Sequence, residues 1–247
     1  LAKDSILIDN QTSDAGKLQT SAAGKSIDLL ADAAITFEAN AQLLSNSGNL
    51  HLESTVGSTT LGILNAGANG NISIKAGDQI LDVQGDDLAA TRTVNILGLG
   101  LRLEAVNGIG AAGTEIETQV TTLAANVTAA GVWLNEKDGL SIGSVAAITV
   151  QRVGSNGSTT PVSDAATLSG ISVANAAAAI ITVGGNTTVD QALSAPGAGN
   201  LRLNVTGTLG INAGIDGGSG HITVLASGAL SQAALGDISS SGSGTID

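Results

Sequence analysis

A five-residue phrase recurs along this chain: a glycine, any residue, an aliphatic residue, a polar residue and a second aliphatic residue. Its clearest copies are residues 48–52, 70–74, 199–203 and 220–224, and its looser copies are residues 24–29, 99–103, 131–134 and 244–247. Adjacent copies begin 22, 21 and 24 residues apart. Alternating aliphatic and polar residues closed by glycine or asparagine are typical of a short β-strand. The spacing therefore predicts a coil in which each turn, or rung, carries two or three short strands.

We expect an all-β fold, a parallel β-helix (β-solenoid) of about 11 rungs of roughly 22 residues each. Residues 1–247 would form it as one segment. Rungs about 4.8 Å apart would give a rod on the order of 50 Å long. No stretch shows a convincing helical stripe of apolar residues, and the alanine-rich residues 174–179 predict a loop that leads into a strand at 180–185.

The composition fits a thin core. The chain has one Trp, one Phe and no Tyr, Met or Cys, so its interior must be built from Leu, Ile, Val and Ala. A coil one side chain thick has little room for aromatic rings, and its corners can use the 34 glycines. A β-sandwich usually anchors on buried Trp, Tyr or Cys, which disfavours that alternative. Without cysteine, a disulfide scaffold and a thiolate zinc site are excluded.

The charge excludes two classes of partner. The net charge of −12 opposes the phosphate contacts that drive nucleic-acid binding, so we expect no nucleic-acid partner. The longest apolar stretch, residues 173–183, is interrupted by Asn175 and is too short to span a bilayer. We therefore expect no membrane insertion.

The two ends of the sequence resemble each other. Residues 16–28 and 236–247 carry aliphatic residues, small residues and a closing Ile-Asp in the same order. The chain also begins with neither an initiator Met nor a signal peptide. We interpret it as an internal repeat unit of a longer chain, about one copy of a multi-rung unit.

The repeats also resemble a known family. Residues 106–125, 139–143, 218–226 and 230–232 look like the filamentous-haemagglutinin-type repeats of giant bacterial surface proteins. The resemblance covers most of the chain and concerns the style of repeat, not a catalytic motif. It implies a right-handed parallel β-helix within a very large exported adhesin or matrix fibre, at the cell surface or outside the cell.

Calcium is the first ligand to consider for an acidic repeat rod. The calcium-binding β-roll repeat needs Asp at the sixth position of Gly-Gly-x-Gly-x-Asp, but in residues 217–222 that position is Ile222. Acidic residues elsewhere could hold an adventitious divalent ion or could simply form solvated turns; they are Asp82 with Asp86 and Asp87, and Glu136 with Asp138. We predict no metal or cofactor site.

The sequence offers no clear catalytic site. Parallel β-helices also carry glycan lyases and hydrolases, and a hydrolase needs two suitably spaced carboxylates. Asp86-Asp87 is the only adjacent acidic pair, and neither accompanying basic motifs nor an aromatic sugar platform is present. Alternation turns His51 away from the aliphatic side, so we predict that both His51 and His221 are surface residues. The chain is predicted not to be an enzyme.

Trp133 and the asparagines leave open questions. Trp133 would face outward if Val132 and Leu134 face inward, and the opposite register would make it part of the core. Six Asn-x-Ser/Thr sequons begin at Asn10, Asn71, Asn126, Asn156, Asn186 and Asn204. We favour turn positions or an amide ladder along the rod over glycosylation for these asparagines.

We therefore expect an extracellular structural or adhesive rod. Its partners would be neighbouring repeats or identical subunits stacked end to end, with host or matrix glycans and proteins as further candidates. The alternatives are a glycan-active β-helix enzyme and a module that anchors calcium or polysaccharide.

Overall fold

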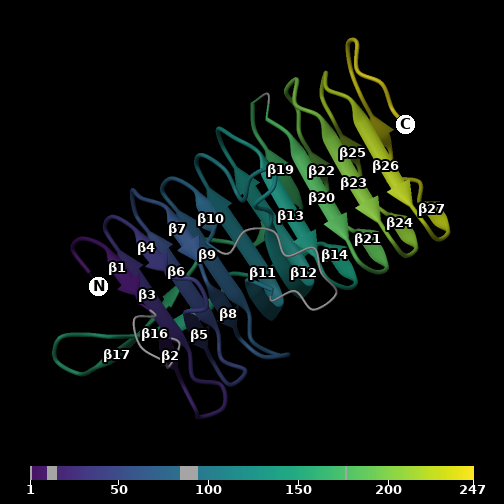
Figure 1. The fold of residues 1–247 in the computed structure, drawn as a ribbon. Helices are drawn as coiled ribbons and strands as arrows, with labels where there is room; N and C mark the ends of the chain where they lie inside the picture. The colour runs from purple at the N-terminus through teal and green to yellow at the C-terminus, as the bar shows by residue number, and fades with distance from the viewer. Residues whose placement is uncertain (1, 10–15, 84–93, 176) are drawn as a thin grey trace.

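The chain forms an all-β solenoid of about ten turns, in which parallel strands stack at a spacing of about 22 residues (Figure 1). The computed structural model describes residues 2–9, 16–83, 94–175 and 177–247, and no helix is present among them. The predicted fold class is confirmed. No described segment is a helix long and apolar enough to cross a membrane.

The coil has three faces, each a ladder of parallel strands. The first face contains β3 (Ile27–Ala31), β6 (Leu50–Ser54), β9 (Ile72–Ala76), the second halves of β11 (Ile96–Ala105) and β12 (Ile116–Val127), and then β19 (Ile171–Val173), β22 (Leu193–Ser194), β25 (Ile215–Asp216) and β28 (Ile238–Ser239). The second face contains β1 (Ile6–Ile8), β4 (Ile35–Phe37), β7 (Thr59–Leu61), β10 (Ile80–Asp82), β13 (Val132–Glu136), β20 (Ala179–Val183), β23 (Leu201–Val205) and β26 (Ile222–Ala226).

The third face completes each rung. It contains β2 (Lys17–Gln19), β5 (Gln42–Leu44), β8 (Ile63–Asn65), the first halves of β11 and β12, and then β14 (Leu140–Ile142), β21 (Thr187–Val189), β24 (Leu209–Ile211) and β27 (Leu230–Gln232). The long strand β11 runs around the corner between the third and first faces. Strand β12 is longer still and runs around two corners, because residues 116–118 pair with β13 on the second face before the strand continues to the third and first faces.

The core is a stack of aliphatic side chains, as the repeated phrase predicts. Leu50 pairs with Ile72, 22 positions later, and both are fully buried. Alternate residues face inward in each strand, so Leu203 is buried while its neighbour Arg202 is exposed. Phe37 lies inside this stack. Burial of about 25 cal/mol per Å² of apolar surface is the main term that holds such a coil together.

One segment leaves the coil, which the repeat pattern does not predict. Residues 144–169, here called the arm, contain β15 (Ser144–Val145), β16 (Thr149–Val153), β17 (Thr159–Ser163) and β18 (Leu168–Ser169). β15 pairs with β18 and β16 pairs with β17, both antiparallel. The arm uses about one rung's worth of residues. Because these residues lie outside the coil, the coil has about ten turns and not the 11 that the chain length predicts.

The resemblance between the two ends of the sequence does not extend to position in the coil. Ile27 pairs with Leu50 on the first face, whereas Ile246 bridges Ile222 on the second face. The two similar segments therefore occupy different faces.

Candidate functional site

A cluster of charged side chains lies between the arm and the first face of the coil. Its members, here called the arm cluster, are Asp28, His51, Ser73, Arg102, Arg152 and Asp164. The first four occupy equivalent outward positions on consecutive strands β3, β6, β9 and β11. The other two come from the arm, at least 50 positions away along the chain. The arm folds back along the rod and covers this column.

Asp28 anchors one end of the arm cluster. Arg152 binds its carboxylate with two nitrogens, Nε to Oδ2 and a terminal nitrogen to Oδ1 at 3.2 Å. His51 Nδ1 lies 2.8 Å from Asp28 Oδ1. Burial alone would raise the pKa of Asp28, but hydrogen bonds from His51 and Arg152 outweigh it and lower this pKa to about 2. The same hydrogen bond raises the pKa of Arg152. A two-nitrogen contact of this kind is strong and directional.

Asp164 anchors the other end. Its carboxylate accepts hydrogen bonds from Ser73 Oγ and from the Ile148 backbone N–H, both at 2.8 Å. Arg102 Nε lies 3.3 Å from Asp164 Oδ2, and Arg102 also donates to Glu104 Oε1 at 2.6 Å and to the Ala166 carbonyl. The side chains of Asp164 and Arg102 are each 4% exposed. Such buried pairs are costly to break because one charge is left uncompensated.

The prediction that His51 is a surface residue is wrong. Its side chain does face away from the aliphatic core, as alternation required, but the arm covers it and the residue is only 4% exposed. Four successive phrases carry a polar residue at the same position, and this pattern predicts that Asp28, His51, Ser73 and Arg102 form a column along the rod. Nothing in the sequence indicated that a segment more than 60 residues away from its partners would cover them.

The arm cluster does not have the geometry of a serine nucleophile site. His51 bonds to Asp28, and Ser73 lies beside it in the next rung, but the Ser73 hydroxyl donates to Asp164. A nucleophile needs its hydroxyl within hydrogen-bond reach of the base. Ser73 is 1% exposed. The arrangement holds the arm to the rod with buried ion pairs.

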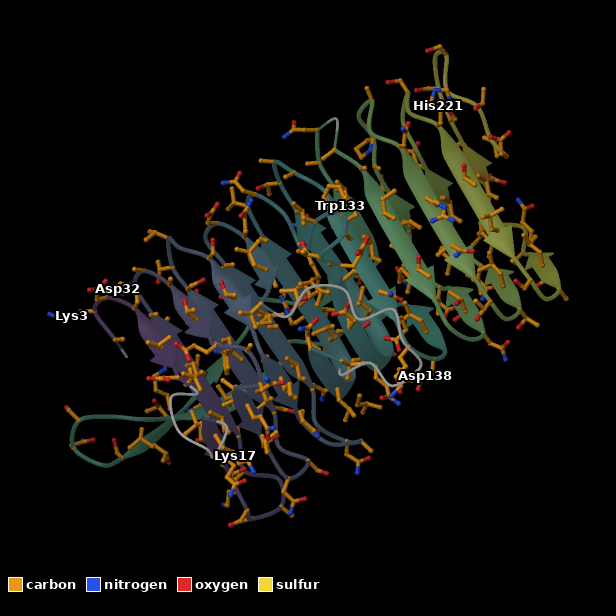
Figure 2. The ribbon with its side chains drawn as sticks, viewed as in Figure 1. Lys3, Lys17, Asp32, Trp133, Asp138 and His221 are labelled. Carbon is orange, nitrogen blue, oxygen red and sulfur yellow. The ribbon has the colours of Figure 1, made fainter. Side chains whose placement is uncertain are left out.

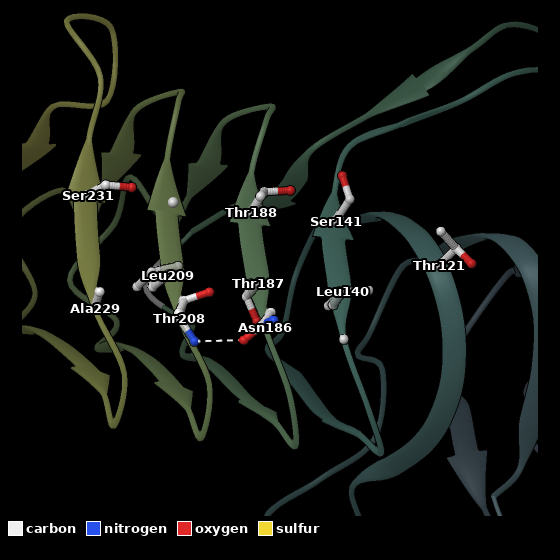
Figure 3. Close-up of a pocket in the computed structure, with 12 residues that line it drawn as sticks. Thr121, Leu140, Ser141, Asn186, Thr187, Thr188, Thr208, Leu209, Ala229 and Ser231 are labelled. Atoms are coloured by element: carbon white, nitrogen blue, oxygen red, sulfur yellow. Dashed lines mark hydrogen bonds between the residues drawn. The ribbon is translucent and has the colours of Figure 1, made fainter.

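A shallow groove of about 470 Å³ runs across the third face (Figure 3). Ser141, Thr188, Gly210 and Ser231 follow one another in register along its floor. Of the residues lining it, none has an ionisable side chain; the list is Thr121, Gly139, Leu140, Ser141, Asn186, Thr187, Thr188, Thr208, Leu209, Gly210, Ala229 and Ser231. The groove therefore offers hydroxyls and an amide, and two of these hydroxyls, those of Ser141 and Thr188, donate to the Asp190 carboxylate at 2.8 and 2.6 Å.

Glu136 is an unexpected inward carboxyl. It follows Val132 and Leu134 on the inner side of β13 and is 1% exposed. Thr118 Oγ1 donates to it at 2.7 Å, and the Val120 N–H donates at 3.1 Å. Burial raises the pKa of Glu136 to about 7, although these hydrogen bonds oppose the shift. The alternation through Val132 and Leu134 was a signal that could have placed this residue.

Of the acidic residues considered for calcium, the structure describes Asp82, Glu136 and Asp138. Glu136 is buried and occupied by protein donors, while its partner Asp138 lies at the surface and accepts from Gln119 Nε2 at 3.0 Å (Figure 2). Asp82 accepts from Asn95 Nδ2 at 2.6 Å. Asp86 and Asp87 lie outside the described residues. No group of three or more metal-ligating side chains occurs among the residues that the structure describes.

Trp133 and His221 lie on the outside of the rod (Figure 2). Val132 and Leu134 are buried and Trp133 is half-buried between them, so the indole faces outward. The prediction of a surface position is confirmed for His221, which is exposed and has its Nδ1 2.8 Å from Thr245 Oγ1.

Turn asparagines link neighbouring rungs. Asn71 donates its backbone N–H to Asn49 Oδ1 at 3.0 Å, and Asn186 Oδ1 accepts the Thr208 N–H at 2.9 Å. A side-chain hydrogen bond also joins two amides of neighbouring rungs, from Asn71 Nδ2 to Asn49 Oδ1 at 3.5 Å. The predicted position between strands is confirmed for Asn71, Asn156 and Asn186. It is wrong for Asn126 and Asn204, which lie within β12 and β23, and Asn10 lies outside the described residues.

The end rungs expose side chains that are buried everywhere else in their columns. Leu18 is 40% exposed, whereas the next residue in its column, Leu43, is fully buried. At the other end Leu230 is 50% exposed above Leu209, which is 1% exposed. Ile246 repeats the pattern, 48% exposed above a fully buried Ile222.

No protein-family model, curated protein or solved structure matches this chain. The resemblance to filamentous-haemagglutinin-type repeats therefore stays a prediction, and the function must be argued from the geometry.

Proposed function

We propose that this chain is a segment of a structural and adhesive rod, a stacked β-helical unit of a filament on a bacterial surface or in its matrix. The observation that carries the proposal is the exposure of inward-facing side chains at both end rungs, Leu18 at one end and Leu230 and Ile246 at the other. One further parallel rung on each end would bury them as their interior counterparts are buried. A neighbouring repeat or an identical subunit would supply that rung.

The energetics favour stacking. Covering a half-exposed leucine or isoleucine contributes roughly 1 kcal/mol, and several such side chains lie at each end. The outermost strands also present a row of backbone N–H and C=O groups that a parallel strand can pair with. Opposing this, each chain carries a net charge of −12. Repulsion between like charges at exposed positions falls as salt screens it.

The position outside the cell rests on the repeat style, which resembles that of exported bacterial adhesins. The adhesive part of the proposal is supported by the groove of the third face, whose hydroxyls suit a neutral, hydrogen-bonding polymer such as a glycan or an extended protein segment. The alternative of a glycan-active enzyme has less support, because a hydrolase needs two suitably spaced carboxylates, and the hydrogen bonds of the floor hydroxyls Ser141 and Thr188 lead to a single carboxylate, Asp190.

Light scattering across a series of protein and salt concentrations tests the proposal. We expect the average mass to rise with both, because salt removes the repulsion that opposes stacking. A chain that stays monomeric at high concentration and high salt would overturn the proposal.

Two matched variants separate end stacking from unspecific association. Leu230→Asp places a charge on the inward side of the last third-face strand, and Ser231→Asp places the same charge on its exposed outer side. We expect Leu230→Asp to abolish the growth in mass and Ser231→Asp to reduce it only slightly. Equal effects would mean that the inward side chains do not form the contact.

A further inference from the structure

The floor of the third-face groove is a straight row of positions, three of which carry hydroxyls. Ser141, Thr188, Gly210 and Ser231 lie at equivalent outward positions of β14, β21, β24 and β27 (Figure 3). Stacked parallel strands put these positions about 4.8 Å apart, so the row is about 14 Å long and runs along the rod axis. A ligand that follows the row meets one floor position per rung.

The hydroxyls of Ser141 and Thr188 have a fixed polarity. Both donate their hydrogen to Oδ2 of Asp190, and Asn212 Nδ2 donates to Oδ1 of the same carboxylate at 2.7 Å. The hydrogen bonds from Thr188, Asn212 and Ser141 lower the pKa of Asp190, so this group is an ionised acceptor at neutral pH. A hydroxyl has one hydrogen and two lone pairs. Ser141 and Thr188 therefore present hydrogen-bond acceptors to the groove.

The opposite edge of the groove supplies a donor. Asn186 lies two residues before Thr188, whereas Asp190 lies two residues after it, so the two flank the floor along the strand. Asn186 is exposed, and its Oδ1 accepts the Thr208 backbone N–H. This bond fixes the orientation of the amide, and its NH2 group is the end that can donate to a ligand. The groove thus suits a ligand that donates at the floor and accepts at this edge.

Sugar hydroxyls meet these demands better than a peptide backbone. Each hydroxyl both donates and accepts, and an extended chain of β-linked six-membered sugar rings advances by about one rung spacing, about 4.8 Å, per ring. In an extended peptide the N–H groups on one side recur about every 6.8 Å, so they fall out of step with the row. The Asp190 carboxylate and the net charge of −12 disfavour an acidic glycan.

Gly210 keeps the groove open. A Cβ at this position would be in ordinary contact with its neighbours, 3.6 Å from Thr188 Cγ2 and 3.7 Å from Ser231 Oγ. The strand can therefore accept a larger residue here, and the added side chain would occupy the space over the floor. Position 210 thus allows the groove to be blocked without a change in the core.

We propose that the groove binds an extended, uncharged, β-linked glycan along the rod axis, with Ser141 and Thr188 accepting hydrogens from its hydroxyls and the Asn186 NH2 group donating to it. This inference rests on the proposed adhesive role and names the ligand class. It is independent of end-to-end stacking.

Titration with cellohexaose tests the site, followed by the amide chemical shifts of the protein at low salt, where stacking is least favoured. We expect shifts at Thr188, Gly210 and Ser231, with a dissociation constant in the millimolar range because the groove is shallow. Maltohexaose has the same sugar units in a coiled chain, and an oligogalacturonate of equal length is acidic. Both should bind several-fold more weakly.

Two pairs of variants locate the binding. Thr188→Val removes a floor hydroxyl with little change of shape and should weaken cellohexaose binding about fivefold through the loss of one hydrogen bond, and Thr188→Ser should recover most of the affinity. Gly210→Gln should abolish the shifts. The same replacement at an exposed outward position of the first face, Ser172→Gln, should leave them unchanged. Amide spectra without sugar check that each variant is folded.

The outcomes separate this inference from the rest of the proposed function. Native affinity in both Thr188→Val and Gly210→Gln would overturn the site even if cellohexaose binds elsewhere. Shifts at the groove with a neutral peptide rich in Ser and Thr, and with none of the three oligosaccharides, would overturn the glycan in favour of a protein segment. No shifts with any probe at millimolar concentration would overturn the site and leave the stacked rod, which light scattering tests, intact.

Discussion

The arm should detach when Asp164 is replaced by alanine. The Asp164 side chain is 4% exposed and receives the Ser73 hydroxyl, the Ile148 N–H and the charge of Arg102. Breaking a buried ion pair by removing one partner costs about 3–5 kcal/mol. Arg102 keeps Glu104 as a partner, so we expect the lower end of that range, about 3 kcal/mol.

This loss should appear as local opening of the arm, because the arm can leave the rod without disrupting the core stack. A change of about 3 kcal/mol raises the open population by about two orders of magnitude. Arg152 is the only Lys or Arg in residues 144–169, so trypsin can cut the arm at one bond only. Cleavage after Arg152 tracks the open population when opening is fast compared with cleavage.

The assay compares initial rates of cleavage after Arg152 in the native chain, in Asp164→Ala and in Thr159→Ala, which changes an exposed arm residue. We expect about a hundredfold faster cleavage in Asp164→Ala and no change in Thr159→Ala. Hydrogen exchange should show the same loss of protection in β16 and β17 while β6 and β9 keep theirs. A rate in Asp164→Ala equal to that of the native chain would refute the assignment of the arm cluster as the arm's anchor.

Three further predictions concern stability. Leu203→Asp should destabilise the coil by several kcal/mol because it buries an unpaired charge. Arg202→Asp, on the exposed side of the same strand, should change the free energy of unfolding by less than about 0.5 kcal/mol. Equal shifts of the two variants in thermal unfolding would disprove the inward position of Leu203. Because the folded pKa of Glu136 is raised to about 7 from 4.5, stability should fall by about 3 kcal/mol as pH rises from 4.5 past 7, and Glu136→Gln should remove this slope in urea titrations. Because the folded pKa of Asp28 is lowered to about 2 from 3.8, its carboxylate should add at most about 2 kcal/mol to the free energy of unfolding above pH 3.8. This contribution should be lost as pH falls through 2. The same decrease of stability at acid pH in Asp28→Asn as in the native chain would contradict this.

The rungs could be predicted from the sequence because each phrase states its own structure. Leu50 and Leu52 or Leu201 and Leu203 alternate with polar residues, and the glycine that opens each phrase marks the corner. Since a solenoid contacts only neighbouring rungs, local pattern and spacing together fix most of the fold. The strands at Leu50–Ser54 and Leu201–Val205 lie where the phrase placed them.

The arm cluster could not be predicted, because it depends on contacts between rod and arm residues more than 60 positions apart. Residues 149–163 read as two strands and a turn, like any rung, and only their pairing partner distinguishes a rung from an antiparallel hairpin. The burial of His51 followed from that hairpin. Glu136 is different: its inward position was implied by the alternation in β13, and its acidic character obscured the pattern.

Mass per unit length of the assembled particles tests the central claim most directly. A unit of 24.0 kDa in about ten rungs, at about 4.8 Å per rung, corresponds to about 0.5 kDa per Å. Scanning transmission electron microscopy or small-angle scattering should give this value for particles of every length, because growth adds rungs only at the ends. A mass per length that doubles as the particles grow would show side-by-side association, and particles that never exceed 24.0 kDa would contradict stacking altogether.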